Sequence, residues 1–167
     1  RVVLRPVIFL THDLCDIFEN QINDLSNNEF EWIRIDFNNL ENQKVFFDYL
    51  DKVEVIVNRF DLNKKIYNQA KKLKLIQLPI SGYDQINLKQ AKSLGIQVCN
   101  AAGANAISVS EHFFSLILAN YRNLFHHHQT VVNGNWINLK DFNEELYGKT
   151  LGIVGFGNIG QQIAKRA

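Results

Sequence analysis

The stretch KTLGIVGFGNIGQQIAKRA, residues 149–167, decides the fold class, because closely spaced glycines join an apolar run to a helical pattern. Residues 151–154 form an apolar run that predicts a strand, and the residues after Gly160 have the spacing of an amphipathic helix. Between them, Gly155, Gly157 and Gly160 have GxGxxG spacing. A strand, this glycine spacing and a helix, in that order, are typical of a dinucleotide-binding βα unit.

Each glycine of this motif has a predicted physical role. Gly155 makes the tight turn, Gly157 lets the backbone approach a pyrophosphate, and Gly160 lets helix and strand pack closely. The first helical amides, at Asn158 and Ile159, then face the phosphates, helped by the helix dipole. The acidic residue that would hold the ribose is expected about 20 residues further on. The predicted cofactor is therefore NAD or NADP, with NAD favoured. A glycine-rich turn in an unrelated α/β protein is the alternative.

The preceding part of the chain alternates short β-rich runs with helical stretches. The predicted strands are Val7–Leu10, Phe30–Phe37, Val53–Val57, Leu73–Leu78 and Ile96–Cys99. Helical spacing is found at residues 12–25, 41–51, 63–73 and 88–95, and Gly95 stands where a left-handed helix cap is wanted. This alternation predicts a parallel sheet with helices on both faces, that is, one flavodoxin-like α/β domain.

A long helical pattern follows over Asn105–Phe125 and is apolar around almost its whole circumference. It is expected to be buried on all sides, as a helix wedged between two domains would be. The polar, glycine-punctuated residues after it predict a surface connection. The predicted division is a flavodoxin-like substrate domain (1–104), a connector (105–148) and the first strand and helix of a Rossmann domain (149–167).

Composition narrows the classes of partner. Hydrophobic residues make up 46% of the chain, charged residues 21%, and the formal net charge is +1. Such a balance gives no electrostatic argument for nucleic acid or a membrane surface as partner, and the apolar runs are too short to span a bilayer. A cytoplasmic protein is expected. Cys15 and Cys99 have no paired spacing and predict reduced, buried thiols. The absence of methionine and the abrupt end predict a piece of a longer chain.

The histidines 126–128 are the most tempting metal ligands in the sequence. Consecutive helical residues point about 100° apart, so three in a row cannot converge on one ion. An exposed helix end, with cations near its C-terminus, is the preferred interpretation. No metal site is predicted.

Several segments resemble, in the same order, the D-isomer-specific 2-hydroxyacid dehydrogenase family. They are SGYDQIN (81–87), GIQVCNAAGANAISVSEH (95–112), NGNW…ELYGKT (133–150) and GKTLGIVGFGNIGQQIAKR (148–166). The resemblance implies a substrate domain interrupted by an inserted Rossmann domain, with the active site in the cleft between them. It also implies that the helix after Asn105 connects the two domains and that the chain stops early in the nucleotide domain.

The family resemblance assigns substrate contacts to residues outside the glycine motif. Backbone amides around Ser81 and Gly82 would hold a carboxylate, since a glycine at the C-terminal end of a strand lets an anion approach exposed N–H groups. A plain turn is the alternative. Ile80 and Pro79 depart from the family pattern, which leaves the loop's shape and the preferred acid open.

Other candidates carry two interpretations each. Asn58 and Arg59 follow a predicted strand and are candidates for the substrate rim, with a solvated loop as the alternative. Asn105 either caps the connector helix or touches substrate. Val109 either faces the nicotinamide or packs within the helix interface.

The resemblance implies an oxidoreductase that transfers a hydride between NAD or NADP and a small 2-hydroxy or 2-oxo acid. The family's catalytic arginine, glutamate and histidine would all lie beyond this chain, which therefore contains no catalytic residue and is expected to be inactive alone. Alternatives are a non-catalytic NAD-sensing corepressor and a formate or phosphite dehydrogenase. A homodimer is expected for the complete protein, and aggregation or dimerisation for the chain by itself.

Overall fold

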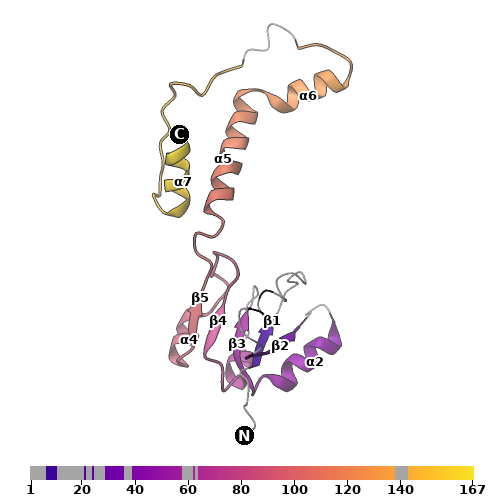
Figure 1. The fold of residues 1–167 in the computed structure, drawn as a ribbon, viewed down its shortest axis with the longest axis vertical. Coiled ribbons are helices and arrows are strands. Elements are labelled where there is room, and N and C mark those ends of the chain that lie inside the picture. The colour runs from indigo at the N-terminus through magenta and orange to yellow at the C-terminus, as the bar shows by residue number, and fades with distance from the viewer. Residues whose placement is uncertain are drawn as a thin grey trace. The chain divides into compact units, whose positions relative to one another are not determined.

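The chain divides into two compact units, residues 1–102 and residues 103–167. The computed structural model describes residues 7–10, 21, 24, 29–35, 39–57, 62, 64–137 and 143–167. Most elements of both units are labelled in Figure 1. The finer division predicted from the sequence, into substrate domain, connector and Rossmann segment, stays a prediction.

The first unit is built on a parallel five-stranded sheet with the order β2-β1-β3-β4-β5. Its strands are β1 Val7–Leu10, β2 Glu31–Arg34, β3 Val53–Val57, β4 Leu75–Gln77 and β5 Gln97–Cys99. Every neighbouring pair in this order is parallel. An order of 2-1-3-4-5 is that of flavodoxin-like folds, so the predicted fold class is confirmed.

Two strands have the bounds that the sequence predicts, and the others are shorter. The ladder of β4 pairs only Leu75–Gln77 with its neighbours. The flanking residues Leu73 and Leu78 are buried although they lie outside the strand. The predicted run Leu73–Leu78 was therefore too long, because burial of an apolar side chain does not require its backbone to pair.

Three helices accompany the described part of the sheet: α2 Leu40–Tyr49, α3 Lys64–Gln69 and α4 Leu88–Ser93. The Asn39 side chain caps α2 by accepting from the Glu41 N–H at 2.9 Å. The C-terminal end of α4 is capped differently, by Gly95 with a φ of +72°. Ile96 N–H donates to the Ala91 carbonyl at 2.9 Å, and Gly95 N–H donates to the Lys92 carbonyl at 3.1 Å. These bonds form a Schellman motif, so the predicted left-handed cap is confirmed. The first predicted helix, residues 12–25, lies largely outside the described residues.

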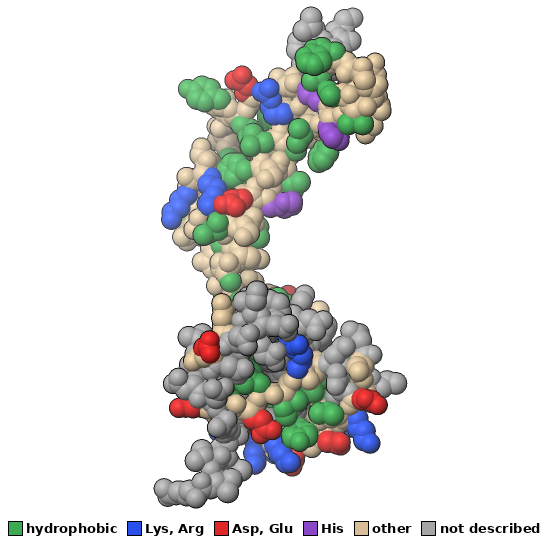
Figure 2. Space-filling view, turned by 45° about the vertical axis from the view of Figure 1, so that its right-hand side comes forward, with side chains coloured by type: hydrophobic (Ala, Val, Ile, Leu, Met, Phe, Trp, Pro, Cys, Tyr) green, Lys and Arg blue, Asp and Glu red, His purple; other side chains and the backbone are tan. Residues whose placement is uncertain are grey.

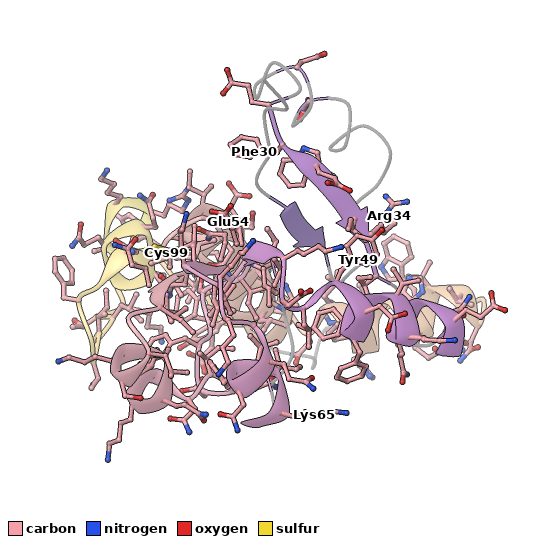
Figure 3. All side chains as sticks on the ribbon, turned by 90° about the horizontal axis from the view of Figure 1, so that it is seen from below. Phe30, Arg34, Tyr49, Glu54, Lys65 and Cys99 are labelled. Carbon is pink, nitrogen blue, oxygen red and sulfur yellow. The ribbon has the colours of Figure 1, made fainter. Side chains whose placement is uncertain are left out.

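The hydrophobic core lies in the first unit. Phe46, Ile56 and Ile76 are fully buried at 0% exposure. Strands of a parallel sheet read as near-continuous apolar runs, and VEVIV in β3 is such a run. Its one charged residue, Glu54 (labelled in Figure 3), forms an ion pair with Lys74. The remaining core residues are Ile35, Leu50, Val53, Leu62, Ile66, Tyr67, Ala70, Leu73, Leu78, Ile86, Ala91 and Ile96.

The second unit contains the helices α5 Ala106–Tyr121, α6 Leu124–Val132 and α7 Asn158–Arg166. Helix α7 packs beside α5 (Figure 1), with Arg166 Nη2 3.6 Å from Glu111 Oε1. The helix predicted over Asn105–Phe125 is confirmed for Ala106–Tyr121 but does not continue to Phe125. Asn123 takes a left-handed φ of +47° and separates α5 from α6, and asparagine is the non-glycine residue that tolerates this conformation best.

The break at Asn123 changes the surroundings of the three histidines. Residues 126–128 lie in the first half of α6, so they do not place cations near a helix C-terminus as predicted. The segment predicted as an irregular surface connection accordingly begins with a helix. Among the described residues, no group of three or more His, Cys, Asp or Glu side chains is placed to hold a metal ion.

Helix α5 is much less buried than its sequence predicts. Ile107 and Leu116 are each 55% exposed and Leu118 is 46% exposed, whereas Ala106 and Ala119 are buried. Figure 2 shows hydrophobic side chains on the surface of this unit. The expectation of burial on all sides is wrong for this chain, because α6 and α7 are the helices that pack on α5 in the described part of its unit.

Two further expectations, the strand at residues 151–154 and the burial of Cys99, are wrong because these segments lack neighbours in the described structure. Residues 151–154 form no strand, and Val154 is fully exposed at 105%. A strand needs a paired neighbour, and the described part of the second unit offers none. Cys99 was expected to be buried but is exposed, since it ends the edge strand β5 (Figure 3). Cys15 lies outside the described residues. None of the helices in the described ranges has the length and apolarity needed to cross a bilayer.

Candidate functional site

The loop over residues 79–82 leaves the C-terminal end of β4 and is tied to the segment that follows β5. Leu78 N–H donates to the Cys99 carbonyl at 2.8 Å, and Ala101 N–H donates to the Ile80 carbonyl at 3.1 Å. These bonds continue the pairing of β4 and β5 beyond the strands themselves. The loop is thus held by the same kind of contact as the sheet.

Two side chains add to this attachment. The Ser81 hydroxyl donates to the Ala101 carbonyl at 3.1 Å, and the Asn100 side-chain amide donates to the Ser81 carbonyl at 2.7 Å. Both bonds lie in half-buried surroundings, where a neutral hydrogen bond contributes about 1 kcal/mol. The 79–82 loop therefore has a fixed backbone conformation.

A small pocket of about 90 Å³ lies beside this loop. It is lined by Leu78, Ile80, Gly82, Tyr83, Asp84, Gln85 and Ile86. Ligands of open α/β sheets bind outside the C-terminal ends of the strands, which is where this pocket lies. Since a water molecule occupies about 30 Å³, the pocket has room for a group as small as a carboxylate.

Gly82 lines the pocket, whereas Ser81 does not. A Cβ on Gly82 would meet only Asp84 Oδ2, at 3.9 Å, which is an ordinary contact distance. Within the described residues, the Gly82 N–H donates to no other group. The absence of a side chain at Gly82 therefore leaves the approach to this backbone N–H open to a ligand.

The charge of the pocket limits how tightly an anion could bind to the loop alone. Asp84 contributes a carboxylate to the pocket wall, and a bound anion would be repelled by it. Backbone N–H groups of the loop supply only partial positive charge. Firm binding of a carboxylate therefore needs a cationic group in addition to the residues that line this pocket.

The GxGxxG motif has the steric features that its spacing predicts. Gly155 has a φ of +96°, which favours glycine. A Cβ on Gly160 would lie 2.3 Å from the Gly155 carbonyl oxygen and 3.3 Å from Ile153 Cγ2. The turn therefore closes directly onto the first turn of α7, and any side chain at residue 160 would push it away.

The N-terminus of α7 presents unpaired backbone donors. Gly157 is the N-cap residue and provides no side chain to cap the helix. The first backbone bond of the helix runs from Gln161 N–H to the Gly157 carbonyl at 3.0 Å. The amides of Asn158, Ile159 and Gly160 precede it and have no acceptor within the helix. Such a terminus attracts phosphate through these donors and the helix dipole.

The remaining candidates are placed as follows. Asn105 is the N-cap residue of α5, but its side chain makes no capping hydrogen bond, so the capping interpretation is not supported. Val109 lies half-buried on α5. Asn58 and Arg59 lie outside the described residues. The structure thus places Ser81 and Gly82 in the first unit, and Asn105, Val109 and the glycine motif in the second.

Two residues that the sequence did not single out take part in these loops. Asn100 holds the 79–82 loop. Gly103, with a φ of +82°, lies so close to the glycine motif that a Cβ on it would be 2.7 Å from Asn158 Nδ2. For Gly103, a glycine shortly before a predicted helix is a signal that could have pointed to this role. Asn100 lies in the stretch 95–112 that resembles the family, but the resemblance assigned it no role.

Comparisons with known proteins agree with this geometry. The model of the family described as D-isomer specific 2-hydroxyacid dehydrogenase, catalytic domain, matches residues 8–162. A hydroxypyruvate reductase of Thermotoga maritima is 40% identical over 120 residues, which cover 71% of this chain and 39% of that protein. A glyoxylate reductase of Pyrococcus furiosus is 32% identical over 173 residues, covering 98% of this chain and 50% of that protein.

A solved structure shows a similar fold. The NAD-dependent formate dehydrogenase of Staphylococcus aureus, in complex with NAD, superimposes with a TM-score of 0.71 at 27% identity, covering 96% of this chain and 52% of that one. The chain thus spans about half the length of these relatives or less.

Proposed function

Because the chain belongs to the D-isomer specific 2-hydroxyacid dehydrogenase family, we propose that the full-length protein transfers a hydride between a nicotinamide cofactor and a small 2-hydroxy or 2-oxo acid. The observation that carries the proposal is the closed glycine turn, with Gly160 against Gly155, in front of an uncapped helix. This arrangement suits the pyrophosphate of NAD or NADP. Relatives named glyoxylate and hydroxypyruvate reductase support a 2-oxo acid as the second substrate.

In the proposed reaction the residues of this chain bind and orient rather than transfer protons. The amides at the start of α7 bind the pyrophosphate, and Gly157 leaves space for it, since a Cβ there would meet nothing within 4 Å. The Gly82 N–H binds the carboxylate of the acid. The nicotinamide, when bound, supplies or accepts the hydride. From the family resemblance we infer that an arginine, a glutamate and a histidine outside this chain complete the site.

The arginine of this set would offset the repulsion between Asp84 and a carboxylate bound in the pocket. Asp84 opposes a bound anion, so a guanidinium that pairs with the carboxylate would restore a favourable charge balance. Histidine suits proton transfer to or from the substrate oxygen near neutral pH. We therefore expect the 167-residue chain alone to show no turnover with any 2-oxo acid.

We also propose that the full-length protein is a cytoplasmic homodimer. The exposed apolar side chains of the second unit support the dimer, among them Leu116, Leu118 and Phe125. Apolar surface of this kind marks association sites in soluble proteins. Analytical ultracentrifugation of the full-length protein would test it, and a monomer at micromolar concentration would contradict it.

Two glycine variants test the proposed division of roles in the full-length protein. Gly82→Ala should raise KM for glyoxylate about tenfold and leave KM for the cofactor unchanged, because the added methyl group occupies the carboxylate approach. Gly157→Ala should do the reverse. Neither Cβ meets the protein closer than 3.9 Å, so both variants should keep the melting temperature of the wild type. Oxidation of NADH and NADPH is followed by absorbance with glyoxylate, hydroxypyruvate and other 2-oxo acids.

The same assay separates the alternatives. Cofactor binding without turnover of any acid would favour an NAD-sensing binding protein. Reduction of NAD with formate, without turnover of 2-oxo acids, would favour the formate dehydrogenase branch, to which the Staphylococcus aureus structure belongs. Either result would overturn the proposed reaction.

A further inference from the structure

We propose that Asn100 is a positioning residue for the carboxylate of the substrate. By holding the Ser81 carbonyl, the Asn100 side chain turns the Gly82 N–H toward the pocket. The identity of the ligand rests on the proposed function. The geometry of the loop does not.

The peptide unit between Ser81 and Gly82 carries both groups. A trans peptide is planar, and its carbonyl and N–H point in opposite directions. The described chain contains no cis peptide bond. Asn100 Nδ2 binds the Ser81 carbonyl oxygen at 2.7 Å, and Asn100 does not line the pocket, whereas Gly82 does. The bond therefore holds the carbonyl on the side of Asn100 and leaves the Gly82 N–H on the side away from it.

The backbone on both sides of Asn100 is itself fixed. The Cys99 carbonyl accepts from Leu78 N–H at 2.8 Å. Ala101 donates its N–H to Ile80 and accepts from the Ser81 hydroxyl, each at 3.1 Å. The Asn100 side chain thus starts from a rigid base, and little conformational entropy is lost when it binds the loop.

Without this bond, the loop could adopt a second backbone conformation of similar free energy. Glycine accepts conformations that other residues avoid, so the peptide before Gly82 can rotate at little cost. A rotated peptide would present the Ser81 carbonyl oxygen, in place of the N–H, to an incoming carboxylate. The Ser81 hydroxyl does not replace Asn100, because it already donates to the Ala101 carbonyl.

Asparagine is also the chemically required residue, since its amide nitrogen donates. Aspartate has the same shape, but its ionised carboxylate only accepts hydrogen bonds. In an Asn100→Asp variant, two acceptors would face each other next to the pocket. Protonation at low pH would give the aspartate an O–H donor and restore the bond to the Ser81 carbonyl.

The test uses Asn100→Ala and Asn100→Asp in the full-length protein, with Asn39→Ala as the matched control. Asn39 also makes a side-chain hydrogen bond to the backbone, but it caps α2 and not the loop. We expect Asn100→Ala to raise KM for glyoxylate, and the dissociation constant of the unreactive analogue oxamate, roughly three- to tenfold. KM for the cofactor should not change. Asn39→Ala should lower the melting temperature without changing KM.

The pH dependence separates positioning from a structural effect. Each variant is compared with wild type at the same pH. The Kd for oxamate of Asn100→Asp, divided by that of wild type, should be largest at roughly pH 7–8 and should fall as the pH approaches about 4, as the aspartate protonates. The same ratio for Asn100→Ala should not fall. Because Asp is isosteric with Asn, this variant keeps the test valid if the Ala variant fails to fold.

Each outcome decides one or both claims. Unchanged oxamate binding in both variants at every pH, with an active wild type, would overturn the role of Asn100 and leave the proposed function standing. A wild type without turnover, whose oxamate binding still depends on Asn100, would overturn the proposed function alone. A wild type that neither binds oxamate nor turns over any 2-oxo acid would overturn both.

Discussion

The two candidate ligand-binding loops of this chain are fixed in opposite ways. The 79–82 loop is held by hydrogen bonds to residues 99–101, which are distant in sequence. The glycine motif at 155–160 is held by its own backbone, with Gly160 pressed against the Gly155 carbonyl. The first loop depends on a completed sheet, and the second depends on local geometry. A search for glycine spacing therefore detects the second loop, but not the hydrogen bond that Asn100 makes to the first.

The two units also differ in how much apolar surface they bury. The first unit contains the buried core cluster around Phe46, Ile56 and Ile76. In the second unit Ala106, Ser110, Ala119 and Gly160 are buried, and large apolar side chains stay exposed. Burial of apolar surface is the main favourable term in folding. Stability of the chain should therefore reside in the first unit.

The largest expected effect is on that core. Phe46→Ala should lower the free energy of unfolding of the first unit by about 3–5 kcal/mol, because it leaves a cavity in place of a fully buried ring. Tyr147→Ala is the matched control in the second unit, where the ring is 93% exposed, and should change the free energy by less than about 0.5 kcal/mol.

Urea unfolding of the 167-residue chain, followed by tryptophan fluorescence, measures both variants. Trp32 on β2 reports on the first unit, and Trp136→Phe removes the signal of the second. Equal losses for Phe46→Ala and Tyr147→Ala would contradict the contrast between the units.

A smaller effect is expected at the glycine motif. Gly160→Ala should weaken cofactor binding to the full-length protein by roughly 2–3 kcal/mol, about 30- to 150-fold in Kd, because its Cβ cannot fit 2.3 Å from a backbone oxygen. Gly152→Ala is the matched control, since a Cβ there meets nothing within 4 Å. Titration with NADH, followed by fluorescence, measures both. Equal binding by the two variants would show that the loop tolerates displacement.

The smallest effect concerns an exposed ion pair of the second unit. Lys149 Nζ lies 2.7 Å from Glu144 Oε2. The hydrogen bond and charge of Lys149 lower the pKa of Glu144, and the hydrogen bond and charge of Glu144 raise the pKa of Lys149. The contribution of Glu144 is present above the ordinary glutamate pKa of 4.5 and is lost as the pH falls through its lowered value. That of Lys149 is present below 10.5 and is lost as the pH rises through its raised value.

Glu144→Gln should therefore lower the melting temperature of the chain by less than about 2 °C at pH 7, since exposed pairs contribute little. The difference from wild type should shrink as the pH falls below 4.5 and vanish once the pH has passed through the lowered pKa of Glu144. Glu145→Gln changes the adjacent exposed residue and controls for the loss of one charge. A difference that persists at low pH would show that the Glu144 charge is not the cause.

The sequence predicts well where one residue type determines the local structure. The bounds of β1 and β3 follow from short apolar runs, and the cap at Gly95 follows from its left-handed conformation. The turn at Gly155 and the close packing at Gly160 follow from the spacing of the motif. Each of these features is decided within a few residues.

The features that the sequence missed depend on distant neighbours. The exposure of Cys99 follows from the edge position of β5, and the exposure of α5 from what packs on it. The hydrogen bond of Asn100 joins it, just after β5, to Ser81 in the loop that follows β4. Asn123 is a partial exception, because the residue type permits a left-handed break but does not require one.

The sheet order also has a consequence for synthesis on the ribosome. β1 is made first but lies inside the sheet, paired with β2 on one side and β3 on the other. Parallel neighbours cannot form by a local hairpin, so β1 must wait for both to be translated. β5 is added last, and the partners of the 79–82 loop come only with and after it. A nascent chain stalled before residue 97 would hold the centre of the sheet while its 79–82 loop still lacked the hydrogen bonds to residues 99–101.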